Sequence, residues 1–316
     1  MKLKTLAALA CGAALVGSAF SQEVEELNLG FDVTSANANG VLAGMMTDED
    51  WFTQGAFLAM GNLVTFAVPD SDFTMVLDVN NASTMVGATW MDSDYHGFLR
   101  KMDGTILTHQ YPGAQATTFN AVTDGGKILG WQYTGLGNYG DFILDRNGQA
   151  TMISIPGYPD AGWYDMNNRG QLMGSWYGGD EGIIGLLYTA GRVEEIAYPD
   201  AGYTVLVDLN NRGDVLGEAT MPWTPDIFGS ESRAFVRKAD GTIATIDYQP
   251  EWPETIQESR YGEVEDLEFY GTLGTRARAI DDSGRVVFVA LAAYVKYGPY
   301  GVEFGTVKER IFATRP

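Results

Sequence analysis

The stretch Asn167-Asn168-Arg169-Gly170-Gln171-Leu172-Met173-Gly174 decides the fold, because it recurs along the chain at a nearly fixed interval. In the 316-residue sequence, the copies end at positions 44, 87, 130, 174, 217 and 288. Successive end points are 43, 43, 44, 43 and 71 residues apart. A fixed period of this size is the signature of a repeat architecture.

The other copies keep the polar start and the glycines with local changes. They are Asn37–Gly44, Asn80–Gly87 with Ser83 at the turn glycine, Thr123–Gly130, Asn210–Gly217, and Asp281–Phe288 with Phe288 in place of the closing glycine. Asn and Asp tolerate left-handed backbone angles and hydrogen-bond their own turn, and glycine takes positive φ without steric cost. The motif therefore predicts a tight turn between two strands, and turn chemistry alone explains its residues.

Each repeat follows the same order of elements. A strand leads into the Asn-rich turn, a second strand such as Gln171–Tyr177 follows it, and a third carries an apolar pair such as Phe98-Leu99. A turn at Asp103-Gly104 then leads into an outer strand at Thr105–Tyr111. Four short strands with their turns fill about 40–45 residues, the size of one propeller blade. No window shows helical periodicity, so we predict an all-β β-propeller with six four-stranded blades of about 43 residues.

The chain ends support a closed ring. Residues 22–44 and 289–316 together make about one period, so both termini are expected to complete one blade and remove exposed sheet edges. The alternative is an open solenoid, which needs polar caps that the sequence does not show. The long last step comes from an insertion around 250–274, rich in Glu, which we expect to be a loop or an extra hairpin. Residues 22–316 are thus predicted to form a single repeat domain.

Residues 1–21 are typical of a secretory signal peptide. Lys2 and Lys4 precede the apolar run Leu6–Val16, and Ala19-Phe20-Ser21 resembles a cleavage site. The run is too short to span a bilayer, so we predict a secreted or periplasmic protein without a membrane span. Cleavage removes Cys11, the only cysteine, and leaves a mature chain without disulfides.

The composition is acidic. The chain has 20 Lys and Arg against 41 Asp and Glu, a net charge of −21 that becomes −23 when the leader is removed. Nucleic acids and anionic membranes reward basic residues, so neither is an expected partner.

The sequence resembles the bacterial HAF-repeat (extracellular repeat) proteins over most of its mature length. The resemblance is carried by Asn167-Asn168-Arg169-Gly170-Gln171 with Gly174, and by the tripeptides Gly55-Ala56-Phe57, His96-Gly97-Phe98 and Arg233-Ala234-Phe235. Ser83 and Phe288 depart from the pattern. The resemblance implies export and a repeated β architecture, and it transfers no reaction.

No catalytic motif stands out. The two histidines, His96 and His109, lie in no nucleophile motif, and without cysteine the mature chain has no Cys/His zinc pattern. Asp-rich turns such as Asp48-Glu49-Asp50 do not match a calcium loop. We therefore expect no catalytic residues, no metal and no cofactor, although the many carboxylates leave a glycosidase pair open.

Aromatic residues are the candidate ligand contacts. Trp90, Trp131 and Trp176 fall three, one and two residues after the closing glycines of successive repeats. They are expected either to pack between blades or to stack on a flat ligand at one rim.

The sequence thus predicts an exported binding or scaffold module whose partner is a protein or a glycan. The alternative is a secreted propeller hydrolase that acts on polysaccharide.

Overall fold

The computed structural model describes residues 16–17, 23–177, 182–222, 231–260, 263–298 and 301–315. Within these ranges the regular structure consists of β-strands, and no helix is present that could cross a membrane. The all-β prediction is confirmed. The predicted leader lies outside the described residues except for β1 (Val16–Gly17), which pairs in parallel with β22 (Ile243–Thr245).

The strands from β3 to β22 pair antiparallel in consecutive groups of four, which we call units 1 to 5. Unit 1 contains β3 (Asp32–Ala36), β4 (Leu42–Thr47), β5 (Thr53–Ala59) and β6 (Asn62–Phe66). Unit 2 contains β7 (Phe73–Val79), β8 (Met85–Met91), β9 (Asp94–Arg100) and β10 (Ile106–His109). Unit 3 contains β11 (Ala116–Val122), β12 (Ile128–Tyr133), β13 (Tyr139–Leu144) and β14 (Ala150–Met152). Unit 4 contains β15 (Gly162–Met166), β16 (Leu172–Tyr177), β17 (Ile183–Thr189) and β18 (Arg192–Ile196). Unit 5 contains β19 (Tyr203–Leu209), β20 (Val215–Thr220), β21 (Ser232–Arg237) and β22.

Unit 6 is built from both ends of the chain. Its strands are β24 (Glu263–Ile280), β25 (Val286–Gly298), β26 (Gly301–Thr314) and the N-terminal β2 (Val24–Glu26). Strand β2 pairs antiparallel with β26, and the backbone N–H of Arg315 donates to the Glu23 carbonyl at 2.7 Å. The N-terminal strand therefore completes the sheet of the C-terminal unit, as the lengths of the two ends predict.

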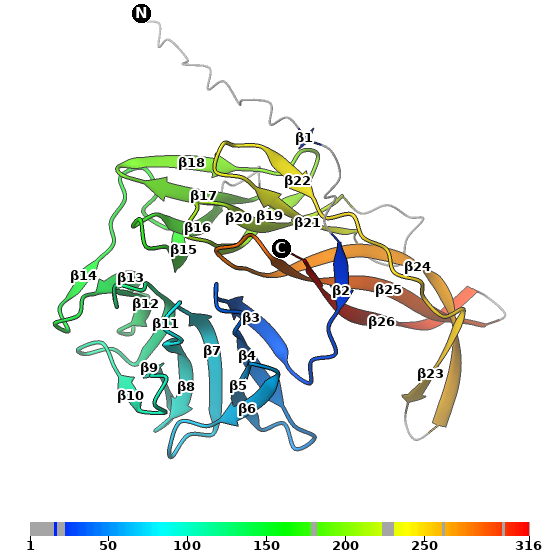
Figure 1. Ribbon diagram of the computed structural model, residues 1–316, viewed down its shortest axis with the longest axis horizontal. Coiled ribbons are helices and arrows are strands. Elements are labelled where there is room, and N and C mark those ends of the chain that lie inside the picture. Colours follow the sequence, from blue (N-terminus) through cyan, green and yellow to red (C-terminus); the bar gives the residue numbers. More distant parts are fainter. Residues whose placement is uncertain are drawn as a thin grey trace, which may run out of the picture.

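The insertion around 250–274 does more than add a hairpin. Strand β23 (Thr255–Arg260) does pair antiparallel with the first part of β24. However, β24, β25 and β26 are 18, 13 and 14 residues long, so all three strands run on beyond the ring as an arm, visible at the lower right of Figure 1. The sequence did not predict that β25 and β26 lengthen together with the insertion.

The six units form a closed ring around a central axis (Figure 1). The first strand of each unit is innermost, and β3, β7, β11, β15, β19 and β24 contact one another in this order, with β24 returning to β3. The arrangement is that of a β-propeller.

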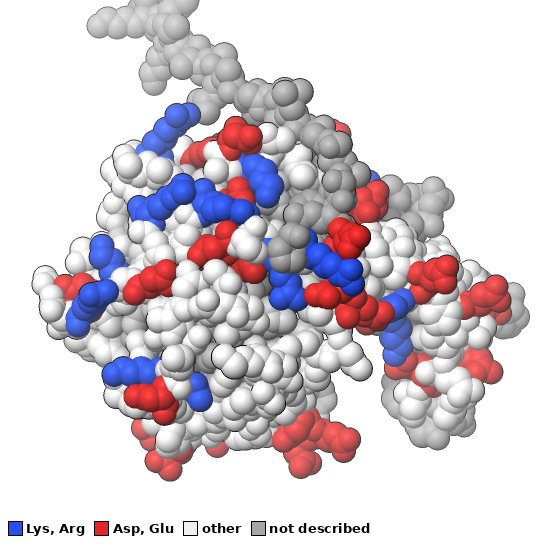
Figure 2. Space-filling model, viewed as in Figure 1, with Lys and Arg blue, Asp and Glu red and all other residues white. Residues whose placement is uncertain are grey.

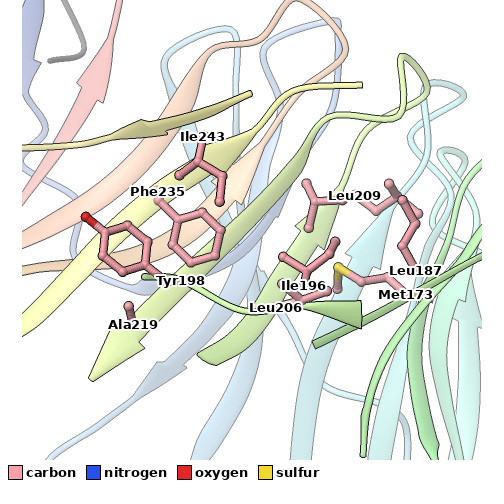
Figure 3. Close-up of a cluster of buried hydrophobic side chains, with 10 residues drawn as sticks. Met173, Leu187, Ile196, Tyr198, Leu206, Leu209, Ala219, Phe235 and Ile243 are labelled. Carbon is pink, nitrogen blue, oxygen red and sulfur yellow. The ribbon is translucent and has the colours of Figure 1, made fainter. Parts of the chain in front are cut away.

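A buried apolar cluster lies between neighbouring units. Between units 4 and 5, for example, Met173, Leu187 and Ile196 face Leu206 and Phe235 (Figure 3). A further cluster joins Ala279, Val287 and Ala313 of unit 6 to Phe31, Val33 and Leu42 of unit 1, so the closing interface is packed like the others. Each sheet thus buries its two faces against its neighbours, which stabilises a unit that cannot fold alone.

The recurring glycines serve two distinct purposes. The turn position has positive φ throughout, for example 74° at Gly170 and 86° at Gly213, and Ser83 adopts 56° at the same position. The closing glycine lies against the inner strand, where a Cβ at Gly87 would come within 1.9 Å of the Met75 carbonyl oxygen. The turn prediction is therefore confirmed, and the closing glycine is required by close backbone approach.

Candidate functional site

The Asn-rich turns meet at one end of the central axis and lock the units together. In unit 2, Asn80 Oδ1 accepts the N–H groups of Ala82 and Thr84 at 3.0 and 2.9 Å, which holds its own turn. Its Nδ2 donates to the Thr123 carbonyl of unit 3 at 3.0 Å. Asn37, Asn167 and Asn210 reach the next unit in the same way. One amide therefore closes a turn and links two units.

The next position of each turn forms a second ring of links. Here a side-chain oxygen accepts the backbone N–H of the preceding unit, at 2.6–3.0 Å, in Asn81, Asp124, Asn168, Asn211 and Asp282. Unit 1 carries Ala38 at this position. Because Ala38 has no side-chain oxygen, unit 1 cannot accept a hydrogen bond from unit 6 at this position. Instead, Asn81 Nδ2 donates to Asp282 Oδ2 at 2.8 Å and joins units 2 and 6 directly. This end of the axis is closed by hydrogen bonds.

Three half-buried aspartates with desolvated carboxyl groups, Asp78, Asp165 and Asp208, lie directly beneath these turns. Each side chain accepts the N–H of the following residue of its own strand and an N–H of the next unit: Val122 for Asp78, Leu209 for Asp165 and Ile280 for Asp208, each at 2.7 Å. We call these residues the Asp layer.

Burial raises the pKa values of the Asp layer. Burial raises the pKa of Asp165 to about 7, and the charge of Asp78 adds to the rise. Burial, followed by the charge of Asp165, holds the pKa of Asp208 well above its usual value. The pKa of Asp78 is also raised by burial. Like charges in a shared buried site cannot all ionise cheaply, so the layer retains protons at mildly acidic pH.

The cavity enclosed by the turns and the Asp layer is small. Its volume is about 50 Å³, enough for a few water molecules. Among the described residues, no group of three or more His, Cys, Asp or Glu side chains is arranged to hold a metal ion. The hydrogen-bonded turns and the small volume make this end of the axis a structural seal.

A second cavity, of about 670 Å³, lies on the other side of the Asp layer, and we call it the chamber. Each inner strand carries a β-bulge, at which one residue is skipped in the pairing with the second strand. One skipped residue from each inner strand lines the chamber: Thr34, Leu77, Asn120, Tyr164, Val207 and Arg278. Strand β24 has two further bulges, at Tyr270 and Leu273, which do not line the chamber. A bulge re-aims the side chain of the unpaired residue, and each of the six that line the chamber is directed to the axis.

The six bulge residues are chemically unlike one another, whereas the turns above them repeat. The residue before each bulge is buried, but the bulge residues are half-buried or, for Tyr164, 40% exposed. Asn120 Oδ1 accepts from Thr118 at 2.8 Å, and within the described part of the chain its Nδ2 has no partner. Arg278 donates to the Ala277 carbonyl at 3.2 Å and pairs with Glu309 at 3.5 Å. The chamber thus presents accessible and varied groups.

A side groove of about 330 Å³ continues from the chamber between units 1 and 6. The two cavities share Asp32, Val33, Met45, Arg278 and Glu309. A ligand in the chamber can therefore extend outward along the seam where the ring closes.

The predicted ligand contacts Trp90, Trp131 and Trp176 lie elsewhere. Each packs against one tyrosine: Trp90 edge-on to Tyr95, Trp131 stacked on Tyr133, and Trp176 edge-on to Tyr158, with ring centres 4.8, 6.4 and 5.6 Å apart. Successive residues of a strand point to opposite faces of the sheet. Trp90 and Trp131 lie an odd number of residues after the closing glycine and Trp176 lies an even number, so Trp176 is on the opposite face from the other two. None of the three lines the chamber. A ligand-binding role for them stays a prediction.

Sequence reasoning missed both the Asp layer and the bulge residues. The Asp layer has a signal, since Asp78, Asp165 and Asp208 each precede an Asn pair by two residues. The bulge residues occupy the same position in each repeat but are of six different types. They could be found only by aligning the repeats and knowing that each inner strand has a bulge at this position.

No family model matches the sequence, and no curated protein matches it. The fold is similar to that of solved β-propellers. TolB from Acinetobacter baumannii is 12% identical with a TM-score of 0.52, over 87% of this chain and 64% of the TolB chain. A catalytically inactive virginiamycin B lyase from Staphylococcus aureus is 11% identical, with a TM-score of 0.44 over 93% and 99% of the two chains. The propeller domain of the Trilobed protease from Pyrococcus furiosus is 9% identical, with a TM-score of 0.42 over 87% and 92%. At these identities the likeness shows the fold alone.

Proposed function

We propose that the protein is an exported, non-catalytic binding module that holds a small ligand in the chamber. The observation that carries the proposal is the set of six bulge residues. The turn position has positive φ in all six units, and the first turn residue is Asn in four of them, whereas the bulge positions hold six different residues around one accessible cavity. Ligand sites are commonly cavities of about 300–1,000 Å³ with apolar walls and a few convergent polar groups.

The distribution of carboxylates favours binding over hydrolysis. Asp and Glu are scattered over the face in Figure 2, many of them beside Lys or Arg, instead of gathering in one hollow. Two carboxylates, Asp32 and Glu309, do line the chamber, but Glu309 pairs with both Arg276 and Arg278. Export and the HAF-repeat resemblance remain predictions that are consistent with this role.

The test is to fill the chamber without changing the ring. Val207→Trp places an indole inside the chamber, whereas Val205→Trp places the same group at a 41% exposed position of the same strand that does not line it. A library of fluorinated fragments is screened by ¹⁹F NMR against the mature wild-type protein and both variants. We expect fragments that bind the wild type and Val205→Trp but not Val207→Trp.

Melting curves must first show that both variants fold like the wild type. Should Val207→Trp fail to fold, Leu77→Trp on the opposite wall replaces it. Fragment binding that is equal in all the variants would refute a ligand site in the chamber, as would an absence of any hit.

A further inference from the structure

The order of the units sets opposite walls in the chamber. In a closed ring of six, units three apart face each other across the axis. Leu77 of unit 2 therefore lies opposite Val207 of unit 5, and Asn120 of unit 3 lies opposite Arg278 of unit 6. Thr34 of unit 1 lies opposite Tyr164 of unit 4. The apolar side chains of Leu77 and Val207 thus face each other across the chamber, and so do the polar side chains of Asn120 and Arg278. This arrangement suits a flat ligand with apolar faces and polar edges.

The charges around Arg278 are already balanced within the protein. Glu309 lies 3.5 Å from Arg278 and 3.7 Å from Arg276, and Arg276 lies 3.6 Å from Glu218. An anionic ligand would have to compete with Glu309 for Arg278 and would meet the net charge of −21. A cationic ligand would have to compete with Arg278 and Arg276 for Glu309, which leaves Asp32 as the one carboxylate of the chamber without an ion pair in the described part of the chain.

A neutral hydroxyl group avoids both conflicts, because it donates one hydrogen bond and accepts others. Vicinal hydroxyls can accept from Arg278 and donate to Glu309 without separating the pair. They can also accept from Asn120 Nδ2, which lacks a partner among the described residues, and donate to Asp32, an exposed carboxylate with no hydrogen bond or ion pair in the described part of the chain. The polar groups of the chamber match a polyhydroxylated ligand.

Tyr164 supplies a surface for the apolar face of such a ligand. The residue is 40% exposed and lines the chamber. Its hydroxyl is hydrogen-bonded to Ser175, so the ring rather than the hydroxyl remains for contact. Exposed aromatic rings bury apolar area at a small cost in side-chain entropy.

We propose, on the basis of the chamber-binding function above, that the ligand is a neutral oligosaccharide. One sugar ring lies in the chamber between Leu77 and Val207 with Tyr164 on its face. The adjoining sugar follows the side groove past Asp32 and Met45, because the groove and the chamber are continuous at these residues. The chamber is therefore a site for a chain end rather than for an isolated monosaccharide.

The experiment measures binding of defined tetrasaccharides to the mature protein by isothermal titration calorimetry. The neutral probes are cellotetraose, maltotetraose, xylotetraose and mannotetraose, and the charged probes are tetragalacturonate and chitosan tetramer. We expect at least one neutral probe to bind, and the matching monosaccharide to bind at least tenfold more weakly, because it cannot occupy the chamber and the side groove together. Binding confined to the charged probes, or absent from the neutral panel at 10 mM, overturns the saccharide assignment.

Variants then locate the site. Tyr164→Ala should weaken binding at least tenfold and Tyr164→Phe should leave it within twofold, because the ring makes the contact. Val207→Trp should abolish binding and Val205→Trp should preserve it. Trp131→Ala should have no effect; a loss with Trp131→Ala, while Tyr164→Ala binds normally, would place the saccharide on the Trp131–Tyr133 stack and overturn the chamber assignment.

Different results contradict the binding function and the saccharide class. If fluorinated fragments bind in a manner blocked by Val207→Trp but no neutral saccharide does, the binding function stands and the saccharide class falls. If neither binds, both fall.

Discussion

At the scale of single residues, the first asparagine of the turn is decisive because both ends of its amide are used. An aspartate can accept the same turn N–H groups, as Asp281 does from Ser283 and Arg285. It cannot donate to the next unit. The choice of Asn over Asp at Asn80 therefore concerns the link between units rather than the turn.

We predict that Asn80→Asp lowers the free energy of unfolding by about 2–3 kcal/mol at pH 7, because a buried carboxylate oxygen would face the Thr123 carbonyl in place of a donor. Urea denaturation measures the change. The matched control is Asp281→Asn, which preserves the turn acceptor and should change stability by less than about 0.5 kcal/mol. Equal losses in the two variants would show that the turn alone matters.

At the scale of the elements, the inner strands bring Asp78, Asp165 and Asp208 together and make stability depend on pH. A carboxyl group whose pKa is raised by folding favours the folded state while it is protonated. Its contribution is complete below the usual pKa of 3.8 and is lost as pH rises through the folded value, about 7 for Asp165. The protein should therefore be more stable at pH 5 than at pH 8.

Asp165→Asn should reduce this pH dependence. Asparagine stays neutral but can accept only one of the two N–H groups that Asp165 binds, so it loses one hydrogen bond at every pH. We therefore expect the change in stability to be more favourable at pH 8 than at pH 4.5 by roughly 2–3 kcal/mol. Chemical denaturation at several pH values measures it. Asp145→Asn, in an exposed turn where hydrogen bonds lower the carboxyl pKa, is the control and should leave the slope between pH 5 and 8 unchanged. A slope in Asp165→Asn equal to that of the wild type would contradict the assignment.

The elements also show what the sequence could predict and what it could not. The turn and the four strands of a unit were predictable, because Asn167, Gly170 and Gly174 carry local backbone requirements that repeat. The bulge at Tyr164 was not, because it follows from how β15 pairs with β16 rather than from the residue itself. The same limit hid the chamber, while the tryptophans could be singled out by residue type and by their recurrence after the closing glycine.

At the scale of the whole molecule, closure rests on both ends of the chain. Besides strand pairing, Glu26 pairs with Arg310, and Arg285 Nη2 lies 3.1 Å from Glu25. Removing residues from Lys308 onward would leave β2 without its partner strand and open the ring.

We expect this truncation to lower the melting temperature by 10 °C or more and to weaken amide protection in unit 3, on the far side of the ring, because each unit is supported by two neighbours. Hydrogen exchange measures the protection of β11–β13. A chain that ends at Arg315 is the control and should melt like the full protein. Loss of protection confined to units 6 and 1 would mean that the units unfold separately and that closure is not cooperative.

The β-bulges separate the residues that build the ring from those that face the chamber, and this has an evolutionary consequence. A mutation at Leu77 or Asn120 alters the chamber without touching a turn amide or a closing glycine, whereas Thr34 also donates to the Val76 carbonyl of unit 2 at 2.8 Å. Most such changes are therefore expected to be tolerated, and a lineage can drift through many chamber compositions while its architecture stays fixed. A combinatorial library confined to the six bulge positions should accordingly contain a high proportion of folded members, among which new binding specificities can be selected.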